Sequence, residues 1–143
     1  MALIKTVVAG KTVLIDSSTI GGANVVLQNV TCDASVAVGN AVRMNSGGTA
    51  INALADSTAN ANVIGVVESK STSVLCNIRV LGVTEGAIFA GLDVTKKYFL
   101  SDAVAGTMVT TPPTASGSVI LKIGQPFSAT ALLVLVGEGI VRA

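Results

Sequence analysis

The sequence contains no histidine, which removes the side chain that enzymes use most often as a general acid or base near neutral pH. The acidic residues stand alone near expected turns, and we interpret them as solvated turn carboxylates. They are Asp16, Asp33, Asp56, Glu68, Glu85, Asp93, Asp102 and Glu138. A carboxylate pair for glycoside hydrolysis could still assemble in space, but no spacing indicates one. We therefore expect a protein that is not an enzyme and has no catalytic residues.

Metal and phosphate motifs are also missing. The two cysteines, Cys32 and Cys76, are far apart and form no CxxC pair, and no Asp-x-Asp calcium loop is present. The glycine pairs 21–22 and 47–48 lack the Lys-Ser/Thr of a phosphate-binding loop and lie between expected strands. We expect no metal and no cofactor. Both cysteines lie in apolar surroundings and are predicted to be buried free thiols, with a disulfide as the alternative.

Aromatic residues make up 3% of the chain, and the formal net charge is +1. Stacking platforms for single-stranded nucleic acid and a field that would attract phosphates are therefore both lacking. Lys96 and Lys97 form the only adjacent basic pair. We expect no nucleic-acid partner, and the few aromatics also argue against a carbohydrate-binding barrel.

Apolar segments do not indicate a membrane protein. The N-terminal stretch MALIKTVVAGK has no positive region ahead of an apolar one, and Lys5, Gly10 and Lys11 interrupt it. The most apolar run, Ala131–Val136, is too short to span a bilayer. We expect a soluble protein made in a cytoplasm.

Charged residues are scarce at 12%, while half of the residues are hydrophobic. About 25% charged residues is typical of soluble domains. One interpretation is that much of the outer surface is buried against copies of the chain or another protein. The other is a surface covered by serine, threonine, asparagine, alanine and glycine.

Short alternating segments dominate what is present. Val63–Val67 and Val74–Leu81 predict a central hairpin, with the polar residues Glu68–Ser73 as its loop. Ala131–Val136 is apolar on both faces, which predicts a strand buried on both sides. Expected strands cover residues 3–8, 12–15, 24–30, 41–44, 49–53, 63–67, 74–81, 97–100, 108–110, 119–124 and 131–136.

These strands and their glycine-rich turns predict an all-β fold. We expect a small antiparallel β-sandwich or barrel of about ten short strands. The division is an extended N-terminal arm over residues 1–30 and a single β-domain over residues 31–143. Two alternatives stay open for the arm: it lies across a neighbouring subunit, or it completes the local barrel.

Several short motifs follow one another in a fixed order after residue 63. They are Ile64-Gly65-Val66-Val67, Gly91-Leu92, Lys97-Tyr98-Phe99-Leu100-Ser101, Gly106, Pro112-Pro113-Thr114, Gly117-Ser118-Val119, Lys122-Ile123-Gly124 and Ser128-Ala129-Thr130. In this order, Val63–Val134 resembles a β-module of tailed-bacteriophage virion proteins, especially capsid decoration (cement) proteins and head or tail fibre proteins. Residues Met1–Thr31 carry no part of this resemblance.

The resemblance implies a structural virion protein that binds the outside of a phage capsid and stabilises the mature shell. It implies a homo-oligomer, commonly a trimer, with the major capsid protein as partner and the capsid surface as location. Alternatives are a head- or tail-fibre base module and, less favoured, a small carbohydrate-binding β-barrel. Apolar residues at chain ends fray unless docked, so we predict that subunit or capsid contacts involve Leu3, Ile4, Val7, Val8, Ile140, Val141 and Arg142.

Overall fold

The computed structural model describes residues 3–8, 11–16 and 24–143, and it describes side chains from residue 24 onward. Within these residues the chain is all strand, turn and loop, without a helix. The strands are β1 (Leu3–Val8), β2 (Lys11–Asp16), β3 (Asn24–Thr31), β4 (Ala41–Met44), β5 (Ala50–Asn52), β6 (Gly65–Thr72), β7 (Leu75–Val83), β8 (Tyr98–Leu100), β9 (Met108–Val109), β10 (Val119–Ile120), β11 (Lys122–Pro126), β12 (Leu132–Leu135) and β13 (Ile140–Val141).

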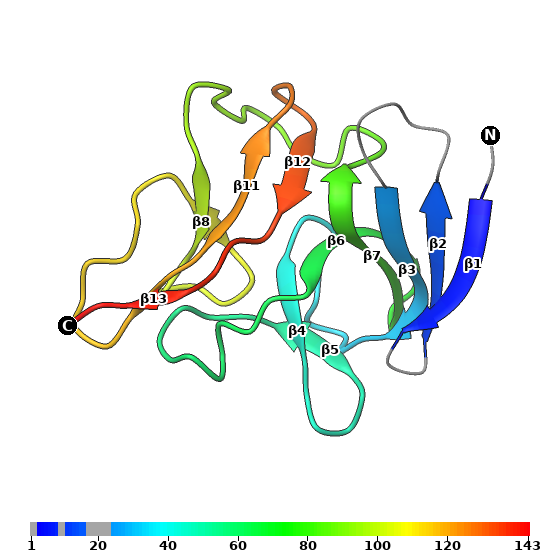
Figure 1. Cartoon of the computed structure of the whole chain (residues 1–143), viewed down its shortest axis with the longest axis horizontal. Coiled ribbons are helices and arrows are strands. Elements are labelled where there is room, and N and C mark those ends of the chain that lie inside the picture. The colour runs from blue at the N-terminus through cyan, green and yellow to red at the C-terminus, as the bar shows by residue number, and fades with distance from the viewer. Residues whose placement is uncertain (1–2, 9–10, 17–23) are drawn as a thin grey trace.

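Eleven of these strands form one curled antiparallel sheet in the order β1-β2-β3-β7-β12-β11-β8-β9 (Figure 1). The strands β6, β4 and β5 branch from β7, and β10 pairs with β13 in a separate two-stranded sheet. The curled sheet forms a half-barrel, and an isolated bridge between Cys32 and Ala50 brings the end of β3 next to β5. The all-β prediction is therefore confirmed.

Strand β7 is the branch point of the sheet. One of its edges pairs with β3, from Thr31↔Leu75 to Val25↔Leu81. Its other edge pairs first with β6 and then, over Leu81–Val83, with β12. The hairpin that the sequence marked as central therefore lies at the centre of the fold.

Two hydrophobic clusters lie on either side of this branch. The first cluster gathers around β8, β11 and β12 and contains Leu100, Ile123, Leu132 and Val134, all fully buried. The second cluster fills the half-barrel between β3, β4, β6 and β7; its members are Val30, Cys32, Val36, Val42, Ala50, Val67, Cys76 and Ile78. The alternation of Cys76 and Ile78 along β7 supplies the second cluster, as the period-two pattern predicted.

Two glycines allow neighbouring strands to approach closely. A Cβ atom at Gly65 would collide with the carbonyl oxygen of Arg79, on the strand that pairs with β6. A Cβ at Gly124 would collide in the same way with the carbonyl oxygen of Leu133. Glycine in a strand interior commonly marks such an approach.

The structure corrects two sequence predictions. The polar residues 68–72 belong to β6 and not to a loop, so the turn is only Ser73–Val74. Strand β12 is buried on one face only, because Leu133 is 39% exposed and Leu135 is 52% exposed. The serine, threonine and lysine side chains of residues 68–73 predicted a loop. Such side chains are equally compatible with an exposed strand, and residues 69–72 of β6 are exposed or half-buried.

The N-terminal segment continues the sheet of its own chain. Strand β1 pairs with β2, β2 pairs with β3, and β3 pairs with β7. The glycine pair 21–22, which the sequence places between two expected strands, lies outside the described residues.

We expect Gly65→Ala to lower the free energy of unfolding by about 1–3 kcal/mol, the usual cost of overpacking. The added methyl group would push β6 away from the Arg79 carbonyl. Urea denaturation measures this. Gly47→Ala is the matched control, because a Cβ there meets only Asn45 Oδ1 at 3.4 Å. Equal stability of the two variants would contradict the close-approach role.

Candidate interaction surface

The predicted C-terminal contact residues are exposed but held in place. Ile140 is 66% exposed and Val141 is 51% exposed, and both lie in β13, which pairs with β10. The Arg142 N–H donates to the Ser118 carbonyl at 2.9 Å. A short apolar strip is thus presented to solvent on an ordered backbone.

The predicted N-terminal contact residues lie on an edge strand. Leu3, Ile4, Val7 and Val8 belong to β1, which ends the sheet and pairs only with β2 among the described strands. Strands β1 and β13 lie at opposite ends of the long axis (Figure 1). The structure therefore does not bring the two predicted groups together into one site.

A third apolar surface was not predicted. It consists of Val25 on β3, Leu81 and Val83 on β7, Leu133 and Leu135 on β12, and Phe127 just after β11; we call these six residues the outer apolar face. Direct pairing places Leu135 beside Leu81, Leu81 beside Val25, and Leu133 beside Val83. Paired residues of neighbouring strands point to the same side of a sheet, so this face is continuous across three strands.

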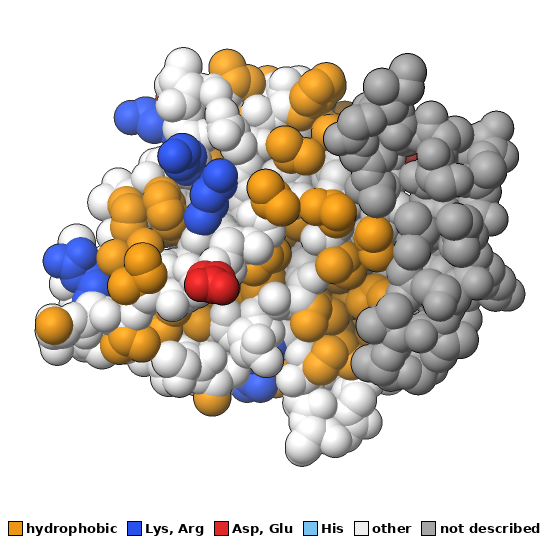
Figure 2. All heavy atoms as spheres, viewed as in Figure 1, with side chains coloured by type: hydrophobic (Ala, Val, Ile, Leu, Met, Phe, Trp, Pro, Cys, Tyr) orange, Lys and Arg blue, Asp and Glu red, His pale blue; other side chains and the backbone are white. Residues whose placement is uncertain are grey.

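Phe127 extends the outer apolar face at the turn between β11 and β12. Its N–H donates to the Ala131 carbonyl at 2.9 Å, which continues the ladder and places Phe127 on the same side as Leu133. The ring is 71% exposed, more than any other large hydrophobic side chain described. Figure 2 shows hydrophobic side chains gathering over the region of β12 and β7, with few charged groups among them.

The signal for this face was present in the sequence. Ala131–Val136 is apolar at every position, which predicted burial on both sides. Leu132 and Val134 fill the first hydrophobic cluster, whereas Leu133 and Leu135 face solvent. The prediction of burial on both sides was therefore wrong, because only the side that carries Leu132 and Val134 is buried.

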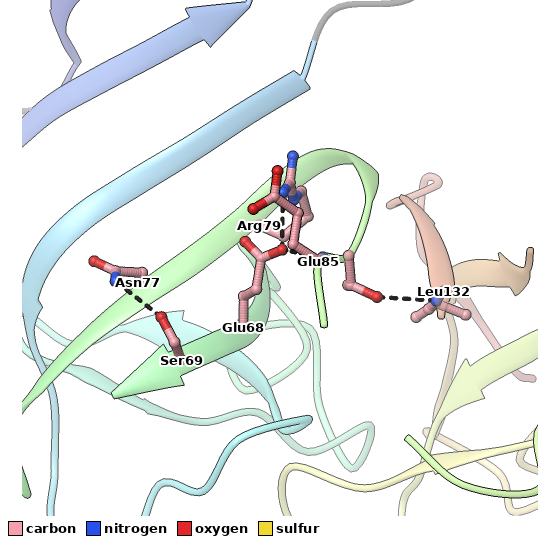
Figure 3. Close-up of polar contacts among 7 residues, drawn as sticks. Glu68, Ser69, Asn77, Arg79, Glu85 and Leu132 are labelled. Carbon is pink, nitrogen blue, oxygen red and sulfur yellow. Dashed lines mark hydrogen bonds and ion pairs between the residues drawn. The ribbon is translucent and has the colours of Figure 1, made fainter. Parts of the chain in front are cut away.

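A buried ion pair joins β6 and β7 close to the point where β7 changes its pairing partner from β6 to β12. Arg79 Nη2 on β7 donates to Glu68 Oε1 on β6 at 2.8 Å, with side chains only 4% and 9% exposed. The Glu85 backbone N–H donates to the same carboxylate oxygen (Figure 3). The expectation that Glu68 is a solvated turn carboxylate was therefore wrong, because β6 carries it into the fold.

The hydrogen bonds next to this ion pair link the hairpin of β6 and β7 to strand β12. Next to Glu85, Thr84 Oγ1 accepts a hydrogen bond from the Leu132 N–H at 3.0 Å (Figure 3). Asn77 Nδ2 on β7 donates to Ser69 Oγ on β6 at 2.9 Å. Arg79 Nε is buried and has no hydrogen-bond partner. The carboxylate is thus occupied by protein donors, and the arrangement is typical of a structural ion pair.

Both cysteines are free and buried, as predicted. They lie in the second hydrophobic cluster, at 2% exposed for Cys32 and 0% for Cys76. Burial, together with a hydrogen bond to Cys32, raises the pKa of the Cys76 thiol to about 12. Because the thiolate is the reactive form, these side chains behave as small hydrophobic core residues.

One groove of about 330 Å³ lies beside β10. Apolar and polar side chains both line this groove, with Glu138 as the ionisable residue among them; the lining is Thr58, Ala61, Asn62, Val63, Val119, Leu121, Val136, Gly137, Glu138 and Gly139. Across residues 24–143 no three histidine, cysteine or acidic side chains cluster as metal ligands would.

Tyr98 and Phe99 are half-buried in β8, and Tyr98 Oη accepts a hydrogen bond from the Asp93 N–H at 3.1 Å. No helix in the described part of the chain is long and apolar enough to cross a membrane.

Comparisons with family models, with curated proteins and with solved structures found no match to this chain.

We expect Arg79→Met to destabilise the protein by about 3–5 kcal/mol, because it leaves the buried Glu68 carboxylate without its cation. Adding Glu68→Leu to Arg79→Met should recover much of that loss, since no buried charge then remains. Urea unfolding of the single and double variants measures this. A double variant less stable than the single one would contradict an isolated structural ion pair.

The Cys76 thiol should make stability depend on pH in the alkaline range. Its pKa in the folded protein, about 12, lies above the ordinary value of 9.0. Its contribution is therefore complete below pH 9.0 and is lost as pH rises toward 12. We expect the free energy of unfolding to fall more steeply over this range in the wild type than in Cys76→Ala. Parallel pH profiles would exclude the effect.

Proposed function

We propose that this chain is a structural protein of a tailed-bacteriophage particle that binds the outside of the capsid and stabilises the mature shell. Exposed apolar side chains on a charge-poor protein carry the proposal, above all Ile140 and Val141 on β13. The motif order of residues 63–134, similar to that of capsid decoration proteins, supports it. The chain would act without catalysis and as a homo-oligomer, with a trimer expected.

The separation of the two predicted contact groups suits this role. A cement protein must reach more than one shell subunit in order to hold a junction closed. Strands β1 and β13 lie at opposite ends of the molecule, so each is free to contact a different subunit (Figure 1). Among the described strands β1 pairs only with β2, and a neighbouring chain can extend its other backbone edge by strand addition.

Stabilisation would follow from mass action. A protein that binds only the expanded, mature shell lowers the free energy of that state and leaves the immature one unchanged. Many copies across the junctions between capsid subunits would then oppose the outward pressure of packaged DNA. In this proposal the apolar pair Ile140 and Val141 supplies the buried core of each contact, and Arg142 lies at its rim.

The test is binding of the purified chain to expanded capsids that lack it, from the phage that encodes it, measured by co-sedimentation. We expect the double variant Ile140→Lys/Val141→Lys to lose binding at least about 30-fold, the size of a hot-spot loss. Val94→Lys is the matched control, because Val94 is also 51% exposed but lies in a loop outside the predicted contact groups.

Deleting residues 2–9 should likewise abolish capsid binding or subunit association. Unchanged occupancy of particles by that deletion variant would exclude β1 as a contact. Band intensity of virion proteins on a gel separates the remaining alternative: hundreds of copies per particle fit decoration, whereas a few copies fit a fibre base module. Failure of the wild-type chain to bind expanded shells would overturn the proposal.

A further inference from the structure

We infer that the outer apolar face is the surface through which copies of this chain bind one another. The proposal rests on the proposed function only for its setting on a particle, since it names how copies join in solution. The six residues Val25, Leu81, Val83, Phe127, Leu133 and Leu135 would be buried between subunits.

The layer structure around β12 is the first argument. One side of β11 and β12 already packs on the first hydrophobic cluster, through Ile123, Leu132 and Val134, each 0% exposed. The other side presents Leu133, Leu135 and Phe127 to solvent. Strands that are apolar on both sides are typical of a sheet covered on both faces. Within the described residues this second side stays exposed at Leu133, Leu135 and Phe127, which leaves it available to a second copy of the chain.

Because the outer apolar face carries no charge, it favours an uncharged partner surface. None of the six residues is charged, and Gln125, which pairs with Leu133, is neutral as well. A partner surface bearing charges would have to desolvate them against hydrocarbon, at a large cost in free energy. The same face on another copy is uncharged and matches it. Interfaces between permanently associated copies are also the most apolar class.

The apolar character of the face suits the centre of such an interface. Apolar patches on the order of 300–600 Å² are the largest that ordinary monomers expose, and they often mark interaction sites. A stable interface buries about 800 Å² on each partner, with an apolar core inside a polar rim. The six side chains supply the core, and the polar residues of the turn at Ser128–Thr130 supply part of the rim.

The position of the face is compatible with the contacts proposed for the shell. Strands β7 and β12 lie between β13 at one end of the molecule and β1 at the other (Figure 1). Association through the middle leaves both ends free. Two apolar sheet faces pack about 10 Å apart with interdigitating side chains. In a symmetric dimer or trimer, copies of one face can meet around the symmetry axis of the oligomer.

The experiment is light scattering of the purified full chain over a range of concentrations, without any capsid present. The wild type should show a mass of at least two chains, each of 14.2 kDa. Leu135→Lys should shift it to the monomer and raise the dissociation constant at least about 30-fold. Val104→Lys is the matched control, because Val104 is 59% exposed in a loop outside the face, and it should leave the mass unchanged.

Two outcomes would overturn the inference: a wild-type monomer at every concentration, or a Leu135→Lys variant with the wild-type mass. Phe127→Ser gives a second measurement, since its ring is 71% exposed and its loss leaves both hydrophobic clusters intact. Far-ultraviolet circular dichroism checks that each variant is folded. A chain that associates in solution but fails to bind shells would retain this inference and contradict the proposed function instead.

Discussion

The rest of the structure depends on strand β7, because it supplies Cys76 and Ile78 to the second hydrophobic cluster and joins β3, β6 and β12 in one sheet. Its residues pair with β3 along one edge and with β6 and then β12 along the other. The change of partner leaves a gap in the ladder, and the Arg79–Glu68 ion pair and the Glu85 N–H lie at this point. A buried pair of charges is a costly choice for stability alone. Its geometry, however, requires that β6 and β7 meet in one register.

A second constraint is the shortage of charge. With 12% charged residues, the chain has few side chains that would forbid association. Among the exposed large apolar residues, Ile140 and Val141 lie together on β13, and Phe127, Leu133 and Leu135 lie together on the outer apolar face, whereas the others lie singly elsewhere. Such a distribution is consistent with a protein whose surroundings are other proteins. The candidate site is therefore a set of surfaces, and the buried Arg79–Glu68 ion pair serves the fold.

Much of the fold could be predicted from the sequence, because period-two alternation and glycine-rich turns are local signals. The hairpin of β6 and β7, the buried face of Val119, Leu121 and Ile123, and the two buried thiols follow from them. Glu68 could not be placed, since its burial depends on Arg79, eleven residues away and on the next strand. The outer apolar face also escaped prediction, because alternation along one strand does not show which neighbouring residues share its face or whether the chain itself covers them.

The arrangement of the ends has a mechanical consequence. Strands β1 and β13 lie at opposite ends of the long axis, and the strands between them run across that axis (Figure 1). A tension applied between these ends would act along the inter-strand hydrogen bonds, so that successive ladders carry the same force in series. The ladder between β10 and β13 has only two residue pairs, whereas that between β1 and β2 has six. Under such tension β13 would peel away first, and the chain would lengthen by a short segment while both hydrophobic clusters stay closed.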